Sequence, residues 1–186
     1  MKKVNYLSKN GQNITVSAFL NFPPGFVESK KCPALVVTHP GGGVKEQTAG
    51  TYGRKLAEQG FVTLVPDASY QGESSGEPRQ LENPYIRTED VTAAIDYLTT
   101  LPCVDANQIG AFGICAGGSY TANAAINDRR IKSVGTVSAV NIGSMFRNDW
   151  LNNVKDADAI PLLERDPTRA ARWPKAVRMP YSRLRQ

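Results

Sequence analysis

Apolar and polar residues alternate between residues 12 and 20. Ile14, Val16, Ala18 and Leu20 fall on one side, and Asn13, Thr15 and Ser17 fall on the other. A period of two with one polar face predicts an outer, antiparallel strand. Tyr6-Leu7, which precedes Asn10-Gly11, supplies a hairpin partner for it.

Largely apolar runs follow at 34–37, 61–65 and 109–114, and one more β-rich run follows at 131–140. Such runs are typical of strands that are covered on both faces. Between them, residues 46–59 and 84–101 show a helical period, the second with Val91, Ala94, Ile95 and Leu98 on one stripe. Strands that alternate with helices predict an α/β protein with a doubly wound, mostly parallel sheet.

The run at 109–114 stops at Cys115, and an Ala-rich helical segment starts at once. We therefore expect a strand, a sharp turn and a helix. A nucleophile at such a turn has a strained backbone, and the residues two before and two after it must be small. Gly113 and Gly117 meet this demand, so the pattern is Gly-x-Ser-x-Gly with Cys in place of Ser. The alternative is that Cys115 is a buried, inert small hydrophobe.

Three motifs in this order carry a family resemblance: His39-Pro40-Gly41-Gly42-Gly43, Asp67 with 70–74, and Gly113 to Gly118. From about residue 3 to 164 the chain resembles the dienelactone-hydrolase-like branch of the α/β-hydrolase superfamily. The resemblance implies acyl transfer from a small-molecule ester, thioester or lactone, with Cys115 as nucleophile. The oxyanion hole would be the N–H of Ala116 and one from Gly41 or Gly42, and the start of the helix would favour the thiolate.

In this superfamily the catalytic acid and histidine follow the nucleophile. The single histidine, His39, lies upstream, so we expect it to shape the oxyanion loop or to make a structural hydrogen bond. The carboxylates Asp128, Asp149, Asp156 and Asp158 are more simply solvated residues. No convincing strand follows 131–140. The sequence thus predicts a fold without its last strands and catalysis disabled by truncation.

The charge changes sharply near the C-terminus. Residues 1–164 carry 15 basic and 16 acidic side chains, whereas 165–186 carry six Arg and one Lys against one Asp. We therefore divide the chain into an incomplete hydrolase core, 1–164, and a basic Pro/Arg-rich tail, 165–186, outside the fold. Our hypothesis is an out-of-frame extension after a frameshift. The rival is a basic arm that contacts nucleic acid or an acidic membrane.

The length, the cysteines and the absence of nucleotide motifs indicate the location and the cofactors to expect. The chain of 186 residues fits one domain, and its three cysteines lack metal-ligand spacing, so reduced thiols and a cytoplasmic location are expected. No Gly-x-Gly-x-x-G or Gly-Lys-Ser/Thr motif indicates a nucleotide, and we expect no cofactor, no metal, no specific nucleic acid and no membrane span. An unpaired strand at 131–140 would favour self-association.

Overall fold

The computed structural model describes residues 1–8 and 13–148. Residues 1–140 form one compact unit, and the chain from Asn141 onward forms a second. The strands are β1 Lys2–Ser8, β2 Ile14–Asn21, β3 Cys32–Thr38, β4 Val62–Pro66, β5 Val104–Ile114 and β6 Ile131–Val137; the helices are α1 Thr48–Glu58, α2 Pro84–Thr99, α3 Ala116–Asn127 and α4 Ile142–Asn148. The predicted alternation of strands and helices is confirmed.

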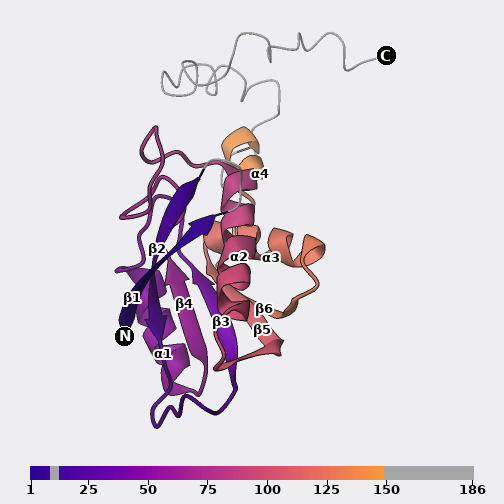
Figure 1. Ribbon diagram of the computed structural model, residues 1–186. Coiled ribbons are helices and arrows are strands. Elements are labelled where there is room, and N and C mark those ends of the chain that lie inside the picture. The colour runs from indigo at the N-terminus through magenta and orange to yellow at the C-terminus, as the bar shows by residue number, and fades with distance from the viewer. Residues whose placement is uncertain (9–12, 149–186) are drawn as a thin grey trace. The chain divides into compact units, whose positions relative to one another are not determined.

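The six strands form one sheet in the order β1-β2-β4-β3-β5-β6 (Figure 1). β3, β4, β5 and β6 run parallel, while β1 and β2 are added antiparallel at one side. In the central pair, Thr38 at the end of β3 lies opposite Gly113 near the end of β5. The residues that follow these two strands therefore meet at the same edge of the sheet.

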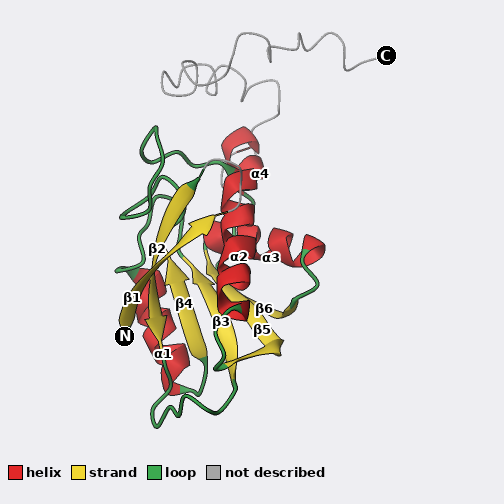
Figure 2. Cartoon of the chain, in the orientation of Figure 1, coloured by secondary structure: helices red, strands yellow, loops and turns green. Residues whose placement is uncertain are grey.

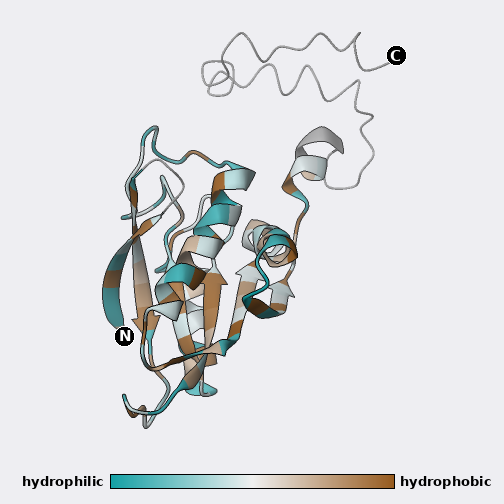
Figure 3. Ribbon diagram, turned by 45° about the vertical axis from the view of Figure 1, so that its right-hand side comes forward, coloured by the Kyte–Doolittle hydropathy of each residue, from teal (hydrophilic) through white to brown (hydrophobic). Residues whose placement is uncertain are grey.

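Helices cover both faces of the sheet (Figure 2). On one face, Ala49 of α1 packs with Val37 and Val65. On the other, Val91 and Leu98 of α2 belong to a larger core with the central strands. Hydrophobic residues accordingly run along the strands in the middle of the sheet (Figure 3). Asn83 caps the start of α2, because its side chain accepts hydrogen bonds from the N–H groups of Tyr85 and Ile86.

The predicted polar face of β2 is confirmed for Asn13 and Thr15, which are exposed, but not for Ser17. Ser17 is buried, because the loop after β4 covers it: the Ser17 N–H donates to Ser74 Oγ, and Asp67 N–H donates to Ser17 O. The predicted hairpin partner is confirmed, since β1, which contains Tyr6 and Leu7, pairs antiparallel with β2 and lies outside it. A polar side chain in an alternating strand can therefore face a covering loop rather than solvent.

At the other side of the sheet, β6 pairs with β5 and has no second neighbour among the described residues. The Val134 side chain on this strand is 41% exposed. Self-association through this edge remains a prediction. The tail 165–186, Asp149, Asp156 and Asp158 lie outside the described residues, and no described helix is both long and apolar enough to cross a bilayer.

Candidate active site

Cys115 lies at the junction between β5 and α3, alone between the end of the strand and the first helical residue. Its backbone has φ 54° and ψ −121°, which a residue with a side chain rarely adopts. The Cys115 N–H donates to Val137 O, and its carbonyl accepts from the N–H of Gly118. The side chain is partly exposed and forms no disulfide. The turn thus presents a reachable thiol at the carboxyl edge of the sheet.

The glycines on either side of Cys115 are required by close backbone packing. A β-carbon on Gly113 would collide with the backbone of Gly117 and Gly118. A β-carbon on Gly117 would lie 2.5 Å from His39 O and 2.7 Å from Thr38 O. Any side chain at either position would push β5, α3 and the end of β3 apart, so the geometry of the elbow depends on both glycines.

The loop after β3 lies against this elbow. Its turn is closed by a hydrogen bond from Gly43 N–H to Pro40 O, with Gly42 at φ +65°. A β-carbon on Gly41 would lie 3.5 Å from Cβ of Ala116, which places the Gly41 backbone beside the first residue of α3. None of the hydrogen bonds within the described residues uses the N–H of Gly41 or Gly42. The first N–H groups of a helix also lack intrahelical acceptors.

His39 is bonded on both ring nitrogens. Nε2 accepts from the N–H of Ala68 at 3.0 Å, which places the ring proton on Nδ1, where it donates to Pro40 O at 2.7 Å. Burial, together with the charge of Arg87, lowers the pKa of His39 to about 3. No hydrogen bond among the described residues joins His39 to Cys115. The imidazole therefore links β3 to the end of β4 as a neutral group.

The far end of the same loop is held by an ion pair that the sequence analysis missed. Lys45 is fully buried, and its Nζ contacts Asp67 at 2.7 Å, Glu73 at 2.6 Å and Glu46 at 2.8 Å. Burial alone would lower the pKa of Lys45, but the bonds to Asp67 and the two glutamates raise it above its ordinary value. Because Asp67 and Ala68 are adjacent, both ends of the His39–Lys45 loop are bonded to one segment after β4.

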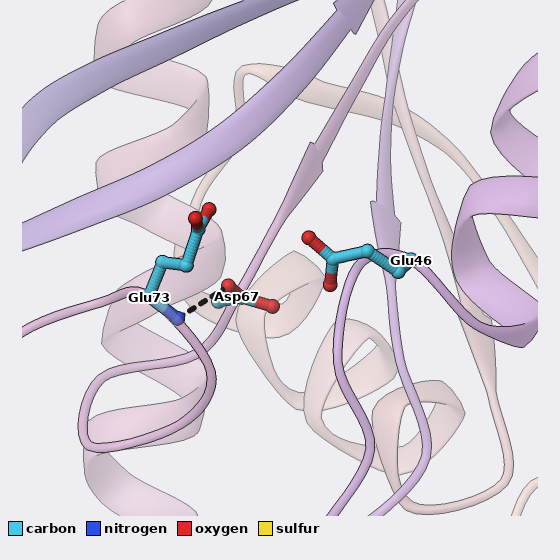
Figure 4. A group of neighbouring side chains, drawn as sticks. All are labelled: Glu46, Asp67 and Glu73. Atoms are coloured by element: carbon cyan, nitrogen blue, oxygen red, sulfur yellow. Dashed lines mark hydrogen bonds between the residues drawn. The ribbon is translucent and has the colours of Figure 1, made fainter.

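Glu46, Asp67 and Glu73 converge within 4.8 Å and offer a donor set for a cation (Figure 4). Lys45 Nζ, however, contacts all three carboxylates and so already fills the position that an ion would take. The bond from Lys3, more than that from Lys45, lowers the pKa of Glu73 to about 2. The negative charge of this carboxylate cluster is therefore compensated by Lys45 and Lys3.

A second buried polar group packs beside the elbow. The Arg87 side chain donates to His39 O at 2.7 Å and lies over the ring of Tyr120 at 5.1 Å. Asp90 accepts from the N–H and hydroxyl of Ser69, and burial raises its pKa to about 6. Neither Arg87 nor Asp90 was predicted. The burial of Arg87 could have been inferred from the sequence, since Arg87 stands four residues before Val91 on the apolar stripe of α2.

One cavity lies under this group, lined by side chains that include Thr38, His39, Arg87 and Tyr120. Its volume of about 10 Å³ is room for roughly one water molecule.

A sheet of this order with a strained cysteine at a strand-to-helix turn is the α/β-hydrolase arrangement. The family model described as the dienelactone hydrolase family matches residues 17–139. The chain belongs to this family, as the motifs predicted.

Individual relatives agree with this assignment. The chain is 68% identical over 162 residues to the protein YcjY of Escherichia coli K12, covering 87% of this chain and 53% of the relative. It is 29% identical to thiohydrolase aneE of Aspergillus aculeatus, covering 91% and 50%. The crystal structure of protein PA2218 from Pseudomonas aeruginosa superposes with a TM-score of 0.82 at 37% identity, covering 88% and 50%. The chain thus spans about half the length of these relatives.

Proposed function

We propose that Cys115 is the nucleophile of a dienelactone-hydrolase-like enzyme that acts on carboxylic ester, thioester or lactone bonds. The observation that carries this proposal is the backbone of Cys115, held at φ 54° between β5 and α3 with the thiol partly exposed. Strain of this kind is retained where the surrounding structure over-determines it, as it does at nucleophile elbows.

The proposed chemistry uses the neighbouring backbone. The thiol of Cys115 loses its proton to solvent and the thiolate adds to the substrate carbonyl, so that a C–S bond forms. The bond between the acyl carbon and the leaving group then breaks, and the leaving group departs with its electron pair and takes a proton from water. The N–H of Ala116 and one N–H from Gly41 or Gly42 would stabilise the oxyanion. Support for this role comes from the contact between Gly41 and Ala116 and from the absence of other hydrogen bonds to the two glycine N–H groups within the described residues.

Release of the acyl group requires a base that this chain does not supply from its histidine. His39 has both ring nitrogens bonded and a pKa of about 3 because of its burial. We therefore propose that the chain of 186 residues forms an acyl-enzyme but does not turn over. Loss of one triad member lowers a rate by roughly three to six powers of ten. The name of the thiohydrolase relative supports a thioester as one substrate type.

The test is a burst experiment with p-nitrophenyl butyrate. We expect release of close to one equivalent of nitrophenolate per chain and then a rate near that of buffer. The Cys115→Ala variant should show no burst, whereas Cys32→Ala, which changes the other partly exposed cysteine, should behave as the parent does. Sustained turnover that survives Cys115→Ala would exclude this cysteine as the nucleophile.

The alternative function, binding through the basic tail 165–186, rests on the charge of that segment alone. It predicts salt-dependent binding to DNA or anionic vesicles that is lost when residues 165–186 are deleted.

A further inference from the structure

A buried arginine beside the elbow has no part in the proposed chemistry. Arg87 of α2 is only 4% exposed, and a buried cation is retained where it is paired and hydrogen-bonded. Its carboxylate partner, Glu82, lies 3.7 Å away and keeps 26% of its side chain exposed, so this pair is loose. The shortest hydrogen bond of Arg87 within the described residues runs from Nη2 to His39 O, at 2.7 Å. The main polar contact of Arg87 is therefore with the loop that follows β3.

The His39 carbonyl lies where this loop meets the elbow. His39 follows Thr38, the last residue of β3, and a β-carbon on Gly117 would lie 2.5 Å from His39 O. The backbone at the start of α3 therefore packs against the same carbonyl that accepts from Arg87. A hydrogen bond from a charged donor is about twice as strong as one from a neutral donor. Arg87 thus fixes the direction in which the chain leaves β3.

The next peptide group carries one of the proposed oxyanion donors. His39 Nδ1 donates to Pro40 O at 2.7 Å, and Gly43 N–H donates to the same oxygen at 3.1 Å. Because a peptide group is planar, fixing Pro40 O also fixes the N–H of Gly41, on the opposite side of the same C–N bond. The ring of Pro40 holds its φ at about −65°, which leaves little freedom between the two carbonyls. The orientation that Arg87 gives to His39 therefore sets the orientation of the Gly41 N–H.

We propose that Arg87 is a positioning residue that aims the Gly41 N–H at the carbonyl oxygen of the substrate. This inference rests on the proposed function, and it narrows the oxyanion donor of the loop to Gly41. Arg87 acts through His39 and does not itself contact the substrate. An apolar side chain would fill the same space without the cost of burying a charge, so packing alone does not explain an arginine here. Its planar fork lets one nitrogen bind His39 O while the guanidinium lies over the Tyr120 ring at 5.1 Å, a combination that lysine does not reproduce.

The experiment compares two reactions of the Cys115 sulfur in the 186-residue chain. Butyryl N-acetylcysteamine acylates the sulfur through an oxyanion, whereas iodoacetamide alkylates it by displacing iodide, with no oxyanion. Peptide mass spectrometry at Cys115 gives both rate constants, and their ratio removes changes in thiol reactivity and access. We expect Arg87→Met to lower the ratio of acylation to alkylation roughly tenfold to a hundredfold, because a donor misplaced by about 1 Å loses this much. Arg87→Lys keeps the charge beside Glu82 but loses the planar fork, so its ratio should lie between those of the parent and Arg87→Met.

Two variants are the matched controls. Leu98→Ala opens a cavity in the buried core near the other end of α2, so it lowers stability without changing the loop after β3. Arg130→Met removes an arginine that pairs with Asp96 and Asp128. Both should keep the ratio of the parent. All variants are compared at a temperature at which circular dichroism shows them folded, and should Arg87→Met fail to fold, Arg87→Lys decides. A ratio like that of the parent in the folded Arg87 variants, or an equal fall in Leu98→Ala, would overturn the inference.

A measurement without substrate separates this inference from the proposed function. NMR relaxation of the backbone amides of Gly41 and Gly42 reports how well the loop is ordered. We expect order parameters of about 0.85 in the parent chain and in Arg130→Met, and a fall towards about 0.6 in Arg87→Lys. A parent chain that is not acylated at Cys115 but shows this loss of order in Arg87→Lys would refute only the nucleophile role. Order parameters that do not change in Arg87→Lys would refute the positioning role.

Discussion

The Lys45–Asp67 pair is predicted to be the largest single polar contribution to the stability of the core. The perturbation is Lys45→Met, which keeps a long apolar side chain but removes the ammonium. Both partners of the pair are 0% exposed, while Glu46 and Glu73 are about half exposed and can be solvated again. Breaking a buried ion pair costs roughly 3–5 kcal/mol because one charge is left buried and unpaired.

The structure places the expected cost at the lower end of that range. Asp67 keeps two backbone donors, Lys45 N–H at 2.7 Å and Glu73 N–H at 2.8 Å, which do not change with the substitution. We therefore expect a loss of about 3 kcal/mol in the free energy of unfolding. At roughly 2–4 °C per kcal/mol for a chain of this length, Tm should fall by about 6–12 °C.

Urea denaturation followed by circular dichroism measures this loss. The matched control is Lys55→Met, because Lys55 pairs with Glu58 at 2.9 Å with both side chains more than half exposed. It should change stability by less than about 0.5 kcal/mol. Adding Asp67→Asn to Lys45→Met should recover part of the loss, since the buried charge is then gone. Equal losses for Lys45→Met and Lys55→Met would refute the reasoning.

Three further predictions follow from packing, titration and the sheet edge. Gly117→Ala should lower the free energy of unfolding, measured by urea denaturation, by about 2–3 kcal/mol, because its β-carbon would meet two carbonyl oxygens. Gly60→Ala has open space around its β-carbon but φ +102°, so it should lower this free energy by only about 1 kcal/mol. Equal losses for the two variants would contradict the predicted collision at Gly117. His39 is neutral when folded, with a pKa of about 3, and titrates near its ordinary 6.5 when unfolded, so its contribution is lost as pH falls from about 6.5 towards 3. The stability advantage of the parent over His39→Gln should therefore shrink between pH 6.5 and pH 4, and an advantage that does not vary with pH would contradict the assignment. Val134→Lys should reduce self-association, measured by light scattering after size exclusion. A parent chain that is already monomeric would contradict self-association through the edge of β6.

Much of the fold could be predicted because it rests on local periods. The continuous apolar run at 34–37 became β3, and the stripe that contains Val91 and Leu98 became the buried face of α2. The turn at Cys115 could be predicted as well, since its close backbone packing requires glycine at 113 and 117, and both positions lie within one stretch of five residues.

The charged parts of the site could not be predicted in the same way. Lys45 and Asp67 are 22 residues apart, and only the parallel pairing of β3 with β4 brings their loops together. Glu82 stands in a polar loop that looks like any solvated segment, yet its carboxylate oxygens are buried beside Gly41. Periodicity describes which face of an element is apolar, but it carries no information about which distant loop will cover a polar side chain.

The most direct test of the central claim is the position of the acyl group after the chain reacts with a butyryl thioester. After an acid quench and proteolysis, peptide mass spectrometry locates the modification. Our account predicts a single butyryl group on Cys115, with Cys32 unmodified and Cys103, which is buried, unmodified too. A butyryl group spread over the three cysteines, or absent from Cys115, would contradict the claim that the turn after β5 holds an activated nucleophile.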